Sequence, residues 1–231
     1  MSIHLQRDLE TLQQQVLAQS ALVEEMIRKA SRAIRGVRPE LVSEIMDHEQ
    51  LVDENEVLIE EACLKILALH QPVARDLRRV ATILKINNDL ERMADLAVNI
   101  AERAQTLADY ADFHVPETLD RMAQLTVQMV KRALDALVHL DVDIARDVGA
   151  SDDEVDTLNR EVISEMQLVM GTQPELIAAA LSLFSASRHI ERIADHATNI
   201  AEDVLYLVNG EIARHKHDLN PDQPSAVVRN C

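Results

Sequence analysis

Hydrophobic residues recur at alternating steps of three and four along most of the chain, which is the spacing of an amphipathic helix. One such stripe runs from Ile83 to Leu107 and another from Ile190 to Val204. The members are Ile83, Ile86, Leu90, Met93, Ala97, Ile100, Ala104 and Leu107, and then Ile190, Ile193, Ala197, Ile200 and Val204. Because positions three and four apart share a helix face, we expect both stripes to face a core.

Glycine and proline fall between these amphipathic runs and divide the chain into six long helices. The expected ranges are about 5–35, 39–70, 72–108, 116–149, 151–171 and 174–210. Ser151, with Glu154 three residues later, has the spacing of a capping box, so we expect the fifth helix to begin there, just after Gly149.

The segment LERMADLAVNIAE at 90–102 returns one hundred positions later as IERIADHATNIAE at 190–202. The dipeptide Gln71-Pro72 also returns, as Gln173-Pro174. A repeat this long indicates that one helical unit was duplicated. The predicted fold is therefore all-α, a tandem repeat of two three-helix bundles with up-down topology. We expect repeats at 1–112 and 113–212 and a polar, disordered tail at 213–231.

The first half of the third predicted helix is also apolar on its outer face, at Val73, Leu77, Val80 and Leu84. A helix that is apolar on two sides is buried on two sides. We expect a second bundle, a second subunit or a partner to cover it. The neighbouring Arg75, Arg78 and Arg79 are expected to rim that contact or to pair with nearby carboxylates.

The composition of the chain excludes several kinds of function. A net charge of −17 argues against nucleic-acid binding, and it disfavours free phosphate as a direct ligand unless a cation or an arginine cluster intervenes. Two cysteines do not make a disulfide scaffold, and Cys63 is expected in the core. Neither a signal peptide nor a membrane-spanning run is apparent, so we expect a cytoplasmic protein without direct membrane insertion.

Acidic residues are paired four apart on four of the predicted helices. The pairs are Glu49 with Asp53, Glu91 with Asp95, Asp152 with Asp156, and Glu191 with Asp195. Like charges at this spacing cost roughly 0.2–0.5 kcal/mol each on an exposed helix, and a bound cation would remove that cost. Oxygen-only ligands suit Mg²⁺, Ca²⁺ or Mn²⁺, and carboxylate-rich sites also hold iron. An ordinary solvated acidic face and an anion-bridging site are the alternatives.

Catalytic motifs are not apparent. None of the nine histidines has Glu or Asp three positions earlier, so the Glu-x-x-His ligands of di-iron bundles are missing. The sequence also lacks a glycine-rich phosphate loop and a nucleophile elbow. His196 follows Asp195 but is replaced by Leu96 in the first copy, so we expect a surface or boundary histidine. The sequence therefore predicts that the protein is not an enzyme.

Three segments together resemble the PhoU-type phosphate-signalling regulators: QPVARDLR at 71–78, NDLERMADLAVNIAE at 88–102 and HIERIADHATNIAE at 189–202. The resemblance implies a cytoplasmic homodimer that represses the phosphate-starvation response. It implies as partners the ATPase of the phosphate ABC transporter and a membrane sensor histidine kinase. It also implies multinuclear iron or other metal ions on the acidic pairs, although the second unit departs from the pattern where it reads PELIAAAL.

Two functional hypotheses follow, and a third is more distant. The first is a regulatory adaptor whose acidic grooves hold metal, with phosphate as a bridging anion. The second is a metal-free interaction scaffold whose acidic stripes dock a surface rich in arginine or lysine. The third is a metal-dependent hydrolase.

Overall fold

The computed structural model describes residues 3–36, 39–110 and 113–210, and these ranges contain helices and no strand. The helices are α1 (Ile3–Ala33), α2 (Pro39–His70), α3 (Ala74–Leu107), α4 (Glu117–His139), α5 (Val142–Thr172) and α6 (Ile177–Asn209), with a short 3₁₀ turn, η1 (Pro174–Leu176), before α6. The predicted tail at 213–231 lies outside the described residues. The predicted division at residue 112 stays a prediction, because residues 111–112 are also outside them.

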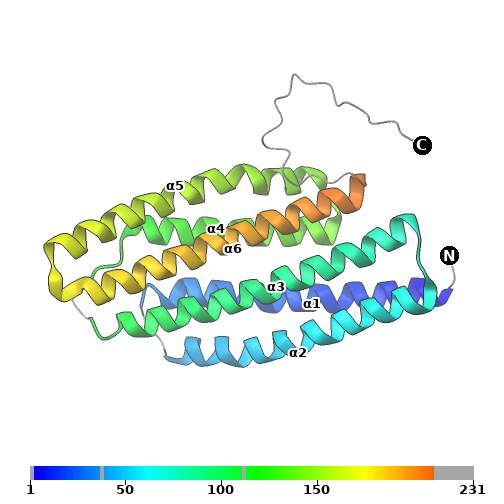
Figure 1. Cartoon of the computed structure of the whole chain (residues 1–231), viewed down its shortest axis with the longest axis horizontal. Coiled ribbons are helices and arrows are strands. Elements are labelled where there is room, and N and C mark those ends of the chain that lie inside the picture. The colour runs from blue at the N-terminus through cyan, green and yellow to red at the C-terminus, as the bar shows by residue number, and fades with distance from the viewer. Residues whose placement is uncertain (1–2, 37–38, 111–112, 211–231) are drawn as a thin grey trace, which may run out of the picture.

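The six helices form two three-helix units that pack along their whole length (Figure 1). Helices α3 and α6 run antiparallel through the middle and make the most extensive helix–helix contact in the molecule. Helix α2 packs on α1 and α3, and α5 packs on α4 and α6. The predicted tandem pair of three-helix bundles is therefore confirmed, with the third helix of each unit at the junction between them.

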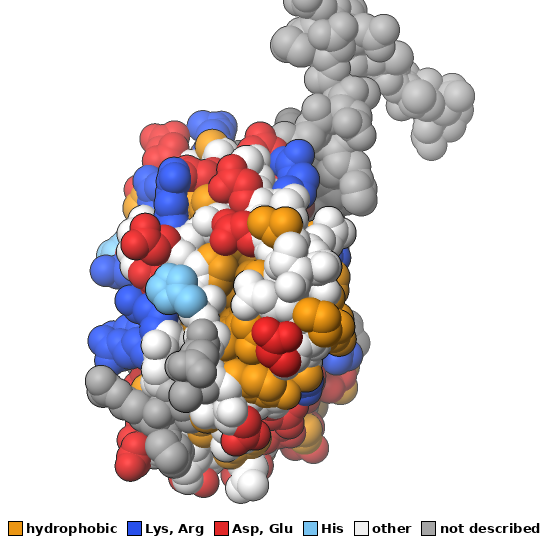
Figure 2. Space-filling model, turned by 90° about the vertical axis from the view of Figure 1, so that its left-hand side faces the viewer, with side chains coloured by type: hydrophobic (Ala, Val, Ile, Leu, Met, Phe, Trp, Pro, Cys, Tyr) orange, Lys and Arg blue, Asp and Glu red, His pale blue; other side chains and the backbone are white. Residues whose placement is uncertain are grey.

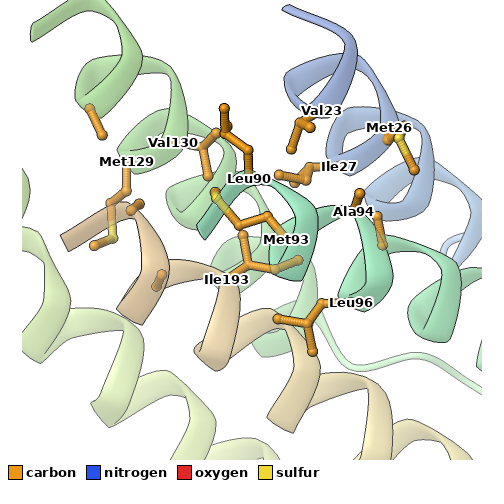
Figure 3. Packing of buried hydrophobic residues seen from close by; sticks show 14 of the residues in the cluster. Val23, Met26, Ile27, Leu90, Met93, Ala94, Leu96, Met129, Val130 and Ile193 are labelled. Carbon is orange, nitrogen blue, oxygen red and sulfur yellow. The ribbon is translucent and has the colours of Figure 1, made fainter. Parts of the chain in front are cut away.

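One hydrophobic core runs through both units. Every member of the two predicted apolar stripes is buried, and Cys63 is buried as well. Figure 3 shows where the units meet: Leu90 and Met93 of α3 lie among Ile27 of α1, Val130 of α4 and Ile193 of α6. The prediction that both stripes face a core is confirmed, and the core they face is shared.

The junction between α4 and α5 differs from the sequence prediction. Helix α4 ends at His139, followed by Leu140 with a left-handed φ of 53°, and does not continue to Gly149. The Asp141 side chain caps α5, accepting hydrogen bonds from the backbone N–H of Asp143 at 2.9 Å and of Ile144 at 3.0 Å. Ser151 lies inside α5 and its hydroxyl donates to the Asp147 carbonyl, so the expected capping box does not form. A helix interior tolerates one glycine at about 1 kcal/mol, so Gly149 need not end it.

Two substitutions test this cap. Asp141→Ala should lower the free energy of unfolding by about 1 kcal/mol, because two backbone N–H groups lose their acceptor. Ser151→Ala should leave it within about 0.5 kcal/mol, because a serine inside a helix caps nothing. Urea unfolding followed by circular dichroism measures both, and equal losses would show that the cap was assigned to the wrong residue.

Polar contacts also join α3 to α6. A hydrogen bond of 2.8 Å links His196 Nδ1 to Asp89 Oδ1, and Lys85 Nζ lies 3.1 Å from Oδ1 of the buried Asp203. His196 is thus the boundary residue that its sequence position predicts, and its partner belongs to the other unit. These directional contacts fix how the two central helices align.

The outer face at the start of α3 is only partly covered. Val80 is buried and Leu84 is half-buried, but Val73 is 76% exposed and Leu77 is 45% exposed. Within the described residues the later half of this face is therefore covered, while its beginning stays open.

Candidate functional site

The first acidic cluster lies where α2 packs on α3. Glu49 and Asp53 come from α2, and Glu91 and Asp95 come from α3. Burial, and then the nearby Asp53 and Asp95, raise the pKa of Glu49 above its ordinary value. Asp53 is one turn away on the same helix, whereas Asp95 belongs to the neighbouring helix. The two predicted pairs therefore lie close together across the contact of α2 with α3.

Glu91 occupies the more enclosed part of this cluster. Burial raises its pKa, as does repulsion from Asp95, while the adjacent Arg92 acts in the opposite direction. Arg92 Nε lies 3.4 Å from a Glu91 carboxylate oxygen, and Arg92 Nη1 lies 3.7 Å from one of Asp95. Glu56 of α2 also adds negative charge near Glu91. One exposed arginine therefore partly balances at least five carboxylates.

The second cluster occupies the equivalent place between α5 and α6. It is formed by Asp152 and Asp156 of α5 with Glu191 and Asp195 of α6. Burial, followed by the charges of Asp195 and Asp156, raises the pKa of Asp152 to about 6. Partial desolvation and the neighbouring Glu191 also raise the pKa of Asp195. These shifts show that negative charge is crowded here as it is in the first cluster.

Neither cluster belongs to the hydrophobic core. Six of the eight predicted residues are half-buried, while Asp53 and Asp195 are exposed. The structure places the acidic residues beside α3 and α6, one cluster in each unit. The prediction omitted the cations at these sites: besides Arg92, Arg188 Nη1 lies 2.8 Å from Glu191 Oε1. Both arginines stand one or three positions from an acidic residue, so helical spacing could have identified them.

The clusters fit a hard cation by donor chemistry. All eight donors are carboxylates, and their mutual repulsion favours a positive ligand. The buried Oε2 of Glu191 has no hydrogen-bond partner within the described part of the chain. In those same residues, however, no group of three or more His, Cys, Asp or Glu side chains converges closely enough to hold a metal ion. Donor type and charge therefore suit metal binding, while the side-chain positions do not form a finished coordination site.

The raised pKa of Asp152 predicts a pH dependence of stability. Between about pH 4 and pH 6 the folded protein binds this proton more tightly than the unfolded chain does. The free energy of unfolding should therefore fall as the pH rises through this window, by about 1 kcal/mol after allowance for solvent screening. Asp152→Asn should flatten the dependence and stabilise the protein at pH 7, whereas the exposed control Asp47→Asn should not. Urea unfolding at pH 4.5 and pH 7 measures the difference. If the wild-type protein loses no more stability between these two pH values than Asp152→Asn does, the prediction is wrong.

None of the helices in the described ranges is long and apolar enough to cross a membrane. The fold and the paired clusters define a class of all-α proteins built from two three-helix units, each with carboxylates gathered beside its third helix.

Comparison with known proteins specifies this class further. The chain belongs to the PhoU family: the family model described as the PhoU domain matches it twice, at residues 16–104 and 119–204. A PhoU homolog of the phosphate-specific transport system from Deinococcus radiodurans is 37% identical over 206 residues, covering 89% of this chain and 97% of that protein. The homolog from Aquifex aeolicus is 38% identical, covering 91% and 96%.

Solved structures agree with the fold. The crystal structure of PhoU from Pseudomonas aeruginosa matches with a TM-score of 0.86 and 34% sequence identity, over 89% of this chain and 99% of that one. The phosphate transport system regulatory protein PhoU from Streptococcus pneumoniae matches with a TM-score of 0.83 and 29% identity, over 90% and 98%. These matches span both units, so the similarity includes the way the units are joined.

Proposed function

We propose that this chain is a cytoplasmic accessory protein of a phosphate-specific transport system, which restrains phosphate uptake and represses the phosphate-starvation response when phosphate is plentiful. The observation that carries the proposal is the double PhoU match, together with relatives of that name that align over nearly their whole length. In this function the protein acts by binding and not by catalysis, as a homodimer that contacts the transporter ATPase and the membrane sensor histidine kinase.

The acidic clusters support a role in recognition. Crowded carboxylates with raised pKa values lower the stability of a protein at neutral pH, so packing alone does not account for them. A cation bound at Glu49, Asp53, Glu91 and Asp95, and another at Asp152, Asp156, Glu191 and Asp195, would remove that repulsion. Such ions would also let an anion approach a surface that otherwise repels it.

Deletion of the gene from the organism that encodes the chain tests the regulatory role. Phosphate uptake and a phosphate-starvation reporter should both rise in high-phosphate medium, and the wild-type gene should restore repression. A deletion strain with normal repression, measured while the transporter and the kinase are both expressed, would refute the proposal.

A metal-free scaffold is the second candidate, and the ion pairs of Arg92 and Arg188 favour it. These pairs show that guanidinium groups bind at the clusters, so a basic partner surface could do the same. Elemental analysis of protein purified without an affinity tag separates the two. Stoichiometric metal, and partner binding that falls in chelator, supports the adaptor, while the opposite result supports the scaffold.

A further inference from the structure

A cavity of about 370 Å³ lies between the two units, away from the acidic clusters. Its wall is aliphatic and comes from α1, α3, α4 and α6. The aliphatic residues of the wall are Val16, Leu17, Ile83, Leu137, Leu140, Leu207 and Val208. No aromatic side chain lines it within the described residues. Its volume is that of a small-molecule site, and its wall suits a flexible hydrocarbon better than a flat ring.

Polar groups of α1 and α3 complete the lining, namely Gln13, Arg75, Asp76 and Arg79. Arg79 donates a hydrogen bond to the Gln13 side chain, while neither Arg75 nor Arg79 forms an ion pair with any residue in the described ranges. Arg79 is half-buried, and this partial loss of hydration lowers the pKa of its guanidinium. The cavity lining thus has two cationic side chains, Arg75 and Arg79, and one carboxylate, Asp76, which is unusual in a chain with a net charge of −17.

The position of Arg75 is unfavourable for the helix itself. Arg75 stands in the first turn of α3, where the helix dipole favours acidic side chains and disfavours cations, and Arg79 stands one turn later. Arg78, beside them, has a structural contact: its guanidinium packs against Gly210, at the end of α6, where the dipole favours a cation. Arg79 donates to the Gln13 side chain instead, and Arg75 forms no ion pair in the described ranges. Counted from the repeated Gln-Pro dipeptide, their equivalents in α6 are Ile177 and Leu181, so the repeated fold does not require arginine at these positions.

The backbone is strained at two places around the cavity. Leu140, in the wall, has a φ of 53°, and Ala74, next to Arg75, has a φ of 50°. Left-handed geometry costs a non-glycine residue about 1–2 kcal/mol, and such residues gather at functional sites because the surrounding structure must hold them in place. Leu140 lines the cavity directly, and Ala74 immediately precedes Arg75, one of the two arginines in the lining.

We propose that this cavity binds a small aliphatic molecule with one anionic head group, such as a medium-chain carboxylate or an alkyl phosphate, with the head held by Arg75 and Arg79 and the chain enclosed by the leucine-rich wall. A guanidinium pairs with two oxygens of either head group, so the ligand binds in one orientation, with its head group at the arginines. Each methylene that enters the wall should strengthen binding about fourfold, so affinity should rise with chain length until the cavity is full.

Titration calorimetry of the full chain with monomeric decanoate tests the site. We expect saturable one-to-one binding that weakens at least tenfold for octanoate, because two methylenes are lost, and at least tenfold for decanol, because the charge is lost. Decyl phosphate should bind as decanoate does. No saturable binding of either anion, or equal binding of decanol, would overturn the proposal.

Variants locate the binding. Arg75→Gln with Arg79→Gln should weaken decanoate binding at least tenfold, whereas Arg28→Gln, an exposed arginine of α1, should not change it. Leu17→Trp should narrow the cavity and weaken decanoate binding at least tenfold while both arginines stay in place, with circular dichroism and a cooperative unfolding transition as the check on folding. Unchanged binding in the arginine double variant would overturn the assignment. So would binding to vesicles of anionic phospholipid in the absence of any binding to monomeric decanoate.

Discussion

Replacing Glu91 and Glu191 by Gln, together with Asp95 and Asp195 by Asn, should abolish repression of the phosphate-starvation response and leave the fold intact. The substitutions remove half of the carboxylates from each cluster, so affinity for any divalent ion there should fall at least tenfold. Because they also relieve repulsion that raises the pKa values of Glu91 and Asp195, the free energy of unfolding should not decrease. A starvation reporter, equilibrium dialysis with Mn²⁺ and urea unfolding measure the three effects.

A control must separate the effect of losing the acidic clusters from the effect of changing the net charge of the protein. Changing the exposed Glu40, Glu61, Glu117 and Glu175 to Gln alters the charge by the same amount outside the clusters, and it should leave repression normal. If the cluster variant unfolds, its carboxylates are structural and the recognition role is wrong. If it folds and still represses, the clusters are not needed for the function proposed here.

Leu90→Ala should lower the free energy of unfolding by about 2–5 kcal/mol. Leu90 is fully buried at the meeting of the two units, beside Met93 of its own helix and Val130 of α4 (Figure 3). Removing its side chain loses apolar burial and leaves a hole that packed helices close only in part. Since the core is continuous, urea unfolding should remain one transition when it is followed by circular dichroism.

The same substitution on the surface provides the comparison. Leu168 of α5 is 67% exposed, so Leu168→Ala should change stability by no more than about 0.5 kcal/mol. Two separate transitions in the Leu90 variant would mean that the units unfold independently. If the two substitutions have equal effects, the side chain of Leu90 contributes no more to the free energy of unfolding than an exposed leucine does.

The helices and their buried faces could be predicted because they depend on local geometry. A rotation of about 100° per residue places Leu90, Met93 and Ala97 on one side whatever the rest of the chain does. The duplicated motif then indicated that α6 would repeat the arrangement, as the burial of Ile193 and Ile200 confirms. The burial of Cys63 was predicted by the same reasoning and is confirmed.

What could not be predicted depends on contacts between helices or on weak local preferences. Nothing in the sequence indicated that Leu140 would take a glycine-like conformation, and the nearby Gly149 was the stronger signal for a helix end. The meeting of Glu49 with Asp95 required knowledge of how α2 lies on α3. The cavity beside Arg79 required all four of the helices that line it.

The surface of the molecule is not uniformly acidic. Figure 2 shows one end of the bundle, where hydrophobic side chains reach the surface together, with basic side chains to one side and acidic ones scattered around. At the end where α5 passes into α6, Leu168, Ile177 and Leu181 are exposed. Contacts with a partner protein therefore have apolar as well as charged side chains available to them.

The antiparallel contact of α3 with α6 has a consequence for fragments of the protein. Each half of the chain supplies part of the surface that shields the other half from water, so a polypeptide ending after α3 would leave Leu90 and Met93 without the cover that α4 and α6 give them. Two copies of that fragment could restore cover by pairing through α3, in the orientation that α3 and α6 adopt here. The expected product of half the gene is an obligate dimer that imitates the whole protein, or else a chain that does not fold.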